Sequence, residues 1–209
     1  TTVRVWDLEE GVAKHILYGH SASVRRVEVL LDEEQPIRVV SASYDTTAII
    51  WDVETGAKLH TLQGHTNQIY ALAVNPKFVV TGSLDHSIRV WDPNTGASVG
   101  SLLGHTALVG QLALRNSLLV SGGSDGSVRV WDLNLMRCTH RIAAHDNTIS
   151  CLSLAGDRVV TGGPDCQISV FNVRSGELIR MLDKNSVTTV WSVAAQEDRL
   201  LTVYSEGSD

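Results

Sequence analysis

Residues 63–102 read QGHTNQIYALAVNPKFVVTGSLDHSIRVWDPNTGASVGSL, and this stretch decides the fold because its landmarks recur along the chain. It holds a Gly-His pair, an Asp twenty residues after that His, and a Trp-Asp pair six residues later. The last landmark returns at spacings of 45, 40, 40 and 40 residues, at Trp6, Trp51, Trp91, Trp131 and, as Phe-Asn, at Phe171. Three landmarks that share one period indicate an internal repeat.

Within each repeat, the runs of β-branched and apolar residues are short and are broken by Gly, Ser and Asp, as in VVTGSLD and SIRVWD. Thr-Gly pairs at Thr55 and Thr95 mark tight turns after the Trp-Asp segment. No stretch places its apolar residues at the helical spacing of about 3.6, so helices should be rare. A period near 40 with four short strands is typical of a β-propeller blade, and we predict an all-β propeller.

The chain, taken as a single domain over 1–209, divides into four full repeats between two half blades. The half blades are 1–17 and 183–209, and the full repeats are 18–62, 63–102, 103–142 and 143–182. With four strands a to d in each blade, the first half blade supplies strands c and d, and the last supplies a and b. We therefore expect a fragment of a seven- or eight-bladed ring; a closed five-bladed ring, in which the half blades complete each other, is the alternative.

The composition excludes several classes of protein. The 209 residues are 43% hydrophobic, which is enough for a core, and their net charge of −6 argues against a broad nucleic-acid-binding surface. The apolar runs are too short to span a bilayer. The three cysteines form no CxxC pair, and no phosphate-binding glycine motif is present, so we expect no metal and no cofactor. A reducing, intracellular compartment fits this cysteine usage.

Each full repeat carries a His, a Ser or Thr, and an Asp at fixed offsets, which is the residue set of a hydrolytic triad. Four near-identical copies cannot all be active sites, so we predict hydrogen-bonded structural relays, no catalytic residue and no enzyme activity. The relay residues of the first three repeats are His20, Ser41, Asp45, Trp51, His65, Thr81, Asp85, Trp91, His105, Ser121, Asp125 and Trp131. In the fourth repeat, Phe171 replaces the Trp and cannot donate a hydrogen bond.

Two local features depart from this regular pattern. The glycine pairs at Gly122 and Gly162 are predicted to provide turn geometry. Residues 30–38, LLDEEQPIR, make the a–b connection of the first repeat five residues longer than in the other repeats. This insertion is either a solvated excursion or an acidic docking surface.

Function should reside in positions that vary between otherwise similar repeats. One such position follows the loop His by five residues, and the other directly precedes the Asp. The first is occupied by Arg25, Tyr70, Gly110 and Ser150, and the second by Tyr44, Leu84, Ser124 and Pro164. A guanidinium flanked by two phenols suits a phosphate or a carboxylate. The alternative is that these are ordinary exposed side chains at strand ends.

The amino-acid sequences of several segments resemble those of a known family. The segments are GHSASVRRVEV (19–29), RVVSASYDTTAIIWDVETG (38–56), LHTLQGHTNQIYALAV (59–74) and FVVTGSLDHSIRVWD (78–92). They resemble WD repeats and, more closely, the C-terminal blades of the cell-division-control-type F-box/WD-repeat receptors, which select phosphorylated substrates for SCF ubiquitin ligases. The resemblance covers most of the chain.

This resemblance implies a substrate-recognition module for ubiquitin-dependent degradation, located in the nucleus and/or cytoplasm. It implies that Arg25 pairs with a phosphothreonine, that Tyr44 and Tyr70 hold the peptide, and that Leu84 lines an apolar pocket. The implied partners are phosphorylated substrate proteins, and the SCF adaptor and cullin through an F-box that this chain lacks; nucleic acid and membrane are not expected as partners. A general WD-repeat interaction scaffold of another complex is the alternative function.

Overall fold

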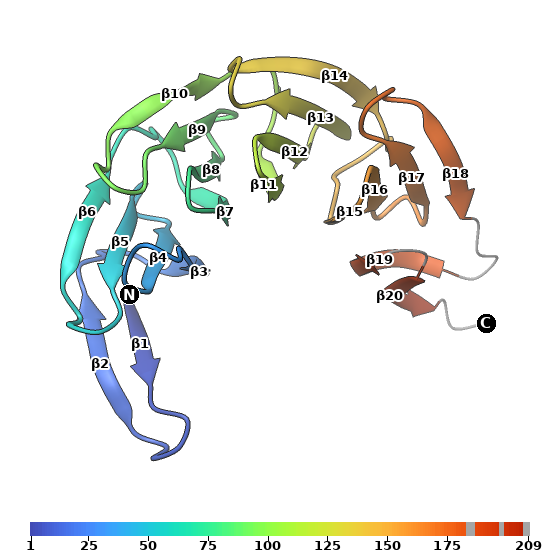
Figure 1. Ribbon diagram of the computed structural model, residues 1–209. Helices are drawn as coiled ribbons and strands as arrows, with labels where there is room; N and C mark the ends of the chain where they lie inside the picture. The colour runs from blue at the N-terminus through green and yellow to red at the C-terminus, as the bar shows by residue number, and fades with distance from the viewer. Residues whose placement is uncertain (183–186, 197–198, 207–209) are drawn as a thin grey trace. The chain divides into compact units, whose positions relative to one another are not determined.

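The computed structural model describes residues 1–182, 187–196 and 199–206, and these residues form strands and turns without a helix (Figure 1). The described residues form four four-stranded sheets and two two-stranded sheets, and in each of them strands consecutive in sequence pair antiparallel. The prediction of an all-β fold made of repeated four-stranded units is confirmed. The chain comprises two compact units, Thr1–Leu103 and Gly104–Asp209.

The first unit holds a two-stranded sheet and two four-stranded sheets. The two-stranded sheet is β1 (Thr2–Trp6) and β2 (Ala13–Tyr18). The next sheet is β3 (Val24–Leu30), β4 (Arg38–Ser43), β5 (Ala48–Asp52) and β6 (Lys58–Leu62). The third is β7 (Ile69–Val74), β8 (Val79–Ser83), β9 (Ile88–Trp91) and β10 (Ser98–Leu102).

The second unit holds two four-stranded sheets and a two-stranded sheet. The first is β11 (Val109–Arg115), β12 (Leu118–Gly123), β13 (Ser127–Asp132) and β14 (Arg137–Ala143). The second is β15 (Cys151–Ala155), β16 (Arg158–Gly162), β17 (Ile168–Asn172) and β18 (Leu178–Leu182). The last is β19 (Val187–Gln196) and β20 (Arg199–Glu206).

The hydrophobic core of each unit forms between neighbouring sheets. In the first unit, Val40 and Ile50 of one sheet share a buried cluster with Leu72 and Trp91 of the next. In the second unit, the corresponding cluster joins side chains of β12–β14 to those of β15–β17. Because each sheet buries its apolar face only against a neighbour, stability resides at these interfaces, as in other repeat proteins.

The residue after each Trp organises the turn between the third and fourth strands. Asp52 accepts a hydrogen bond from the Thr55 backbone N–H at 2.8 Å, through its side-chain oxygen. In the fourth repeat, Asn172 Oδ1 accepts the Arg174 backbone N–H at 2.8 Å and the N–H of Ser175, the residue equivalent to Thr55, at 3.2 Å. An amide oxygen can accept these bonds in place of a carboxylate, which explains why Asn can replace Asp here.

The glycine pairs of the second unit correct the prediction of turn geometry. None of Gly122, Gly123, Gly162 and Gly163 has a left-handed backbone. They instead permit close packing: a Cβ on Gly122 would lie 2.9 Å from Ile149 Cγ2, and one on Gly123 would lie 2.6 Å from His105 Nδ1. Their small size, and not their conformational freedom, is what the fold uses.

Candidate functional site

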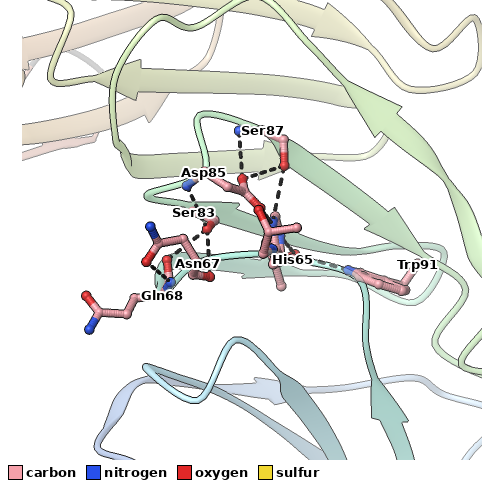
Figure 2. Close-up of polar contacts among 9 residues, drawn as sticks. His65, Asn67, Gln68, Ser83, Asp85, Ser87 and Trp91 are labelled. Atoms are coloured by element: carbon pink, nitrogen blue, oxygen red, sulfur yellow. Dashed lines mark hydrogen bonds and ion pairs between the residues drawn. The ribbon is translucent and has the colours of Figure 1, made fainter.

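The relay of the second repeat connects four side chains, three of which are buried (Figure 2). His65 Nδ1 lies 2.8 Å from Asp85 Oδ2, and an ionised carboxylate can only accept, so Nδ1 donates. His65 Nε2 therefore accepts from the Thr81 hydroxyl at 2.8 Å, and that hydroxyl accepts the Trp91 indole N–H at 3.0 Å. Each group therefore donates to the next, from the indole to the hydroxyl to the imidazole, and the carboxylate is the final acceptor.

Several other donors surround Asp85 and hold it ionised. Burial by itself would raise the pKa of Asp85, but hydrogen bonds from the Ser87 hydroxyl and from the backbone N–H groups of Thr66 and Ser87 lower it to about 2. Burial lowers the pKa of His65, which favours the neutral ring that the relay requires. The relay therefore combines a fixed negative charge with a neutral imidazole.

The first and third repeats contain the same relay at the predicted positions. In the first repeat, the His20 ring contacts Asp45 and Ser41, each at 2.8 Å, and Trp51 donates to Ser41 at 2.8 Å. In the third repeat, the corresponding contacts join His105 to Asp125 at 3.0 Å and to Ser121 at 2.8 Å, and Trp131 donates to Ser121 at 2.8 Å.

The three relay hydroxyls are those of Ser41, Thr81 and Ser121, and each of these residues is completely buried. No substrate can reach a hydroxyl that is packed inside a sheet interface. The arrangement is therefore structural, because it satisfies buried polar groups and does not present a nucleophile.

The fourth repeat keeps part of this relay. His145 contacts Asp165 at 2.7 Å and Thr161 at 2.9 Å. Phe171 has no side-chain N–H to donate to the Thr161 hydroxyl, whose one proton is shared between His145 Nε2 at 2.9 Å and, over a longer contact, the Ser169 carbonyl at 3.5 Å. This relay is one donor shorter than the others.

A second set of histidines was missed as a pattern in the sequence. His15, His60 and His140 each donate from Nε2 to a backbone carbonyl in the turn of the following repeat, at 2.9, 2.9 and 2.8 Å. Each ring also packs against a turn glycine of left-handed conformation, for example His60 against Gly96. The signal that could have identified these residues is their spacing, which follows the same period as the Trp-Asp pairs.

The first variable position lies on a β-bulge in the first three repeats. The ladder of β3 and β4 passes from Val24 directly to Arg26, so Arg25 is the unpaired extra residue. Tyr70 and Gly110 occupy the same place in the next two repeats, as does Trp191 in β19. A bulge frees a side chain from the ladder and redirects it, which is a structural basis for variation at this position.

The second variable position is tied to the loop that precedes the bulge. The Tyr44 backbone N–H donates to the Ser23 carbonyl at 3.0 Å, and the Leu84 N–H donates to the Gln68 carbonyl at 2.9 Å. Both variable positions of a repeat therefore lie at the same end of its strands. The first unit thus presents Arg25, Tyr44, Tyr70 and Leu84 at one end of two neighbouring sheets.

The two phenol rings of this group are in direct contact. The ring centroids of Tyr44 and Tyr70 lie 4.9 Å apart at an interplanar angle of 40°, and the Tyr70 hydroxyl donates to Gln68 Oε1 at 3.1 Å. Burial and the hydrogen bond to Tyr44 raise the pKa of Tyr70, and the positive charge of Arg25 opposes this rise. Arg25 is exposed, while Tyr44, Tyr70 and Leu84 are half-buried.

The corresponding positions of the second unit carry no charge, since they are Gly110, Ser124, Ser150 and Pro164. The Ser150 hydroxyl already donates within the fold, to the carbonyl of Gly162 at 3.0 Å.

Among the described residues, no group of three His, Cys, Asp or Glu side chains is placed to hold a metal ion, and no helix could cross a membrane. The Arg and Tyr group of the first unit is therefore the candidate site for a ligand.

A family model described as WD domain, G-beta repeat matches residues 11–52, 56–92, 96–132 and 136–172. The chain belongs to the WD40 repeat family. Proteins of this family are generally non-enzymatic scaffolds that bind other proteins. The predicted WD-repeat membership is confirmed, and the closer resemblance to F-box receptors stays a prediction.

The chain was also compared with curated proteins and with solved structures. A search of curated proteins found no match. Among solved structures, the chain is similar to the computationally designed Ika8 protein, crystallised in space group P63, with 30% sequence identity and a TM-score of 0.86. The match covers 96% of this chain and 61% of that one, so this chain spans less than two thirds of its length.

Proposed function

We propose that this WD40 chain recognises phosphorylated protein segments through Arg25, Tyr44, Tyr70 and Leu84, as the substrate-recognition module of an SCF-type ubiquitin ligase. The observation that supports this proposal is the gathering of one guanidinium and two phenols, from two neighbouring repeats, at one end of their strands. The module performs no chemistry itself. It acts by binding a substrate that other subunits then modify.

The chemistry of the group suits a phosphate ester. Among the described residues, Arg25 has no carboxylate within ion-pair distance, so its guanidinium is available for two charge-assisted hydrogen bonds. The Tyr44 hydroxyl offers a further polar contact, and the rings of Tyr44 and Tyr70 offer a flat face for the peptide. Leu84, on the turn after β8, adds an apolar side chain beside them.

The partners follow from the resemblance to F-box/WD-repeat receptors. Phosphorylated proteins would occupy the Arg25 site, and an F-box outside this chain would recruit the adaptor and the cullin. A place in the nucleus and/or cytoplasm belongs to the same proposal. We propose neither nucleic acid nor membrane as a partner, because the chain is acidic overall, with a net charge of −6.

Fluorescence anisotropy with a labelled phosphothreonine-proline peptide tests this proposal. Arg25→Ala should weaken binding at least about tenfold, because a hydrogen bond to a charged group contributes about 1.5–3 kcal/mol. The matched control is Arg26→Ala, which removes the same charge one residue away. Arg26 is not on the bulge, because it pairs with Ala42 in the β3–β4 ladder. Its affinity should stay close to that of the parent.

Two results would contradict phosphate recognition. One is equal affinity for the unphosphorylated peptide, and the other is an equal loss in the Arg25 and Arg26 variants. Either result would leave the general scaffold, which binds unmodified proteins, as the better description of the chain.

A further inference from the structure

The connection between β3 and β4 carries an open pocket that the proposed phosphopeptide site does not use. Seven residues join these strands, whereas four join β7 to β8 and two join β11 to β12. The pocket has a volume of about 580 Å³. Its lining residues are Leu31, Asp32, Glu33, Glu34, Ile37 and Pro76.

The apolar part of the pocket consists of exposed side chains that lie next to one another. Leu31 is 64% exposed and Ile37 is 52% exposed. Pro76, from the β7–β8 connection of the next repeat, supplies a third apolar side chain. Because these three apolar side chains line one pocket, they form a contiguous apolar patch, and such a patch suits contact with a partner.

The polar part of the pocket is negatively charged. Asp32 Oδ2 lies 3.7 Å from Nη2 of Arg38, whose side chain is buried, so this pair is largely compensated within the fold. Glu33 and Glu34 are exposed and belong to the pocket lining. Lys77 follows Pro76 but lies outside the lining. Two carboxylates therefore remain to attract a positively charged ligand.

The insertion is anchored to the neighbouring repeat. Arg38 Nη1 donates to the Pro93 carbonyl and to Asn94 Oδ1, both at 2.9 Å. Within its own repeat, the Ile37 carbonyl of the insertion accepts the Val53 backbone N–H at 3.1 Å. A loop that is already held in place loses little conformational entropy when a partner binds.

We propose that this pocket docks a basic segment of a partner protein, in which an aliphatic side chain is flanked by lysine or arginine. The aliphatic side chain would contact Leu31, Ile37 and Pro76, and the basic side chains would pair with Glu33 and Glu34. The pocket lies at the far end of β3 from the Arg25 bulge, a distance of roughly 20 Å along a strand of this length. Both sites can therefore be occupied at once, and this proposal does not rest on the proposed function.

Isothermal titration with a short peptide of alternating lysine and leucine tests the proposal on the whole chain. Glu33→Lys combined with Glu34→Lys should weaken binding at least tenfold, and Leu31→Ser combined with Ile37→Ser should weaken it to a similar degree. The matched control is Glu9→Lys with Glu10→Lys, which makes the same charge change on the exposed β1–β2 turn. This control should keep the parent affinity, and added salt should weaken binding of the parent.

The other outcomes overturn the proposal. If the Glu9 and Glu10 variant loses as much affinity, the peptide is responding only to net charge. If a peptide of alternating glutamate and leucine binds equally well, the surface is apolar without charge selectivity. If sedimentation shows self-association that the Leu31 and Ile37 variant abolishes, the occupant is a second copy of this chain. Circular dichroism melting of each variant separates these outcomes from loss of the fold.

Discussion

The fourth repeat differs from the others at two positions that compensate each other. In the first repeat, a Cβ on Gly19 would lie only 2.9 Å from Cη2 of Trp51, so the glycine makes room for the indole. The fourth repeat has Ala144 and Phe171 at the equivalent places, within one buried cluster. The phenyl ring is smaller than the indole, which leaves space for the alanine methyl group.

This arrangement predicts a strong coupling between Phe171→Trp and Ala144→Gly. Phe171→Trp alone restores a donor to Thr161, which contributes about 1 kcal/mol, but overlap with the Ala144 methyl costs about 1–3 kcal/mol. Ala144→Gly alone should cost about 1 kcal/mol through lost burial and added backbone freedom. The double variant removes the overlap and keeps the new bond, so its stability should equal or exceed that of the parent. The expected coupling is about 2 kcal/mol.

Urea unfolding of the parent, both single variants and the double variant measures this coupling. The indole N–H of the double variant should also exchange slowly in proton NMR, as expected for a buried donor. Thr161→Val, which removes the acceptor, should cost more in the double variant than in the parent. Additivity of the two single changes within about 0.5 kcal/mol would refute the reasoning, because the two positions would then not share a space.

Two further predictions concern pH and the histidine–glycine contacts between repeats. Asp125 has a pKa of about 2 against an ordinary value of 3.8, so its contribution to stability is complete above about pH 4 and is lost as the pH falls toward 2. Burial lowers the pKa of His105 below its ordinary 6.5, so protonation of this ring also destabilises the fold as the pH falls below that value. The midpoint of thermal unfolding should therefore decrease as the pH is lowered from 8 to 2. Gly176→Ala should destabilise the chain by more than about 1 kcal/mol, because the backbone φ is +74° and the new Cβ would lie 3.0 Å from the His140 ring. Gly11→Ala is the control, since φ there is +69° and nothing lies within 4 Å of the new Cβ; equal melting temperatures of the two variants would show that the His140 contact is unimportant.

Much of the fold and part of the candidate site could be predicted from the sequence because their signals are local and repeated. The Trp-Asp period locates the strands, since each repeat must solve the same problem of turn geometry and sheet packing. The twelve relay residues could be selected because the same donor and acceptor types recur at fixed offsets. The variable positions at Arg25 and Tyr70 were found by their departure from this regularity.

Only the tertiary structure decided how these positions meet, because the contacts join residues that are distant in sequence. The bulge at Arg25 depends on the pairing of β3 with β4, and the Tyr44–Tyr70 contact depends on how two neighbouring sheets pack. The same holds for Gly122, whose small size matters because Ile149, in the loop before β15, packs against it. The chain by itself determined which elements form and repeat. Packing between sheets determined which side chains share a surface, since that depends on distances that no spacing along the sequence encodes.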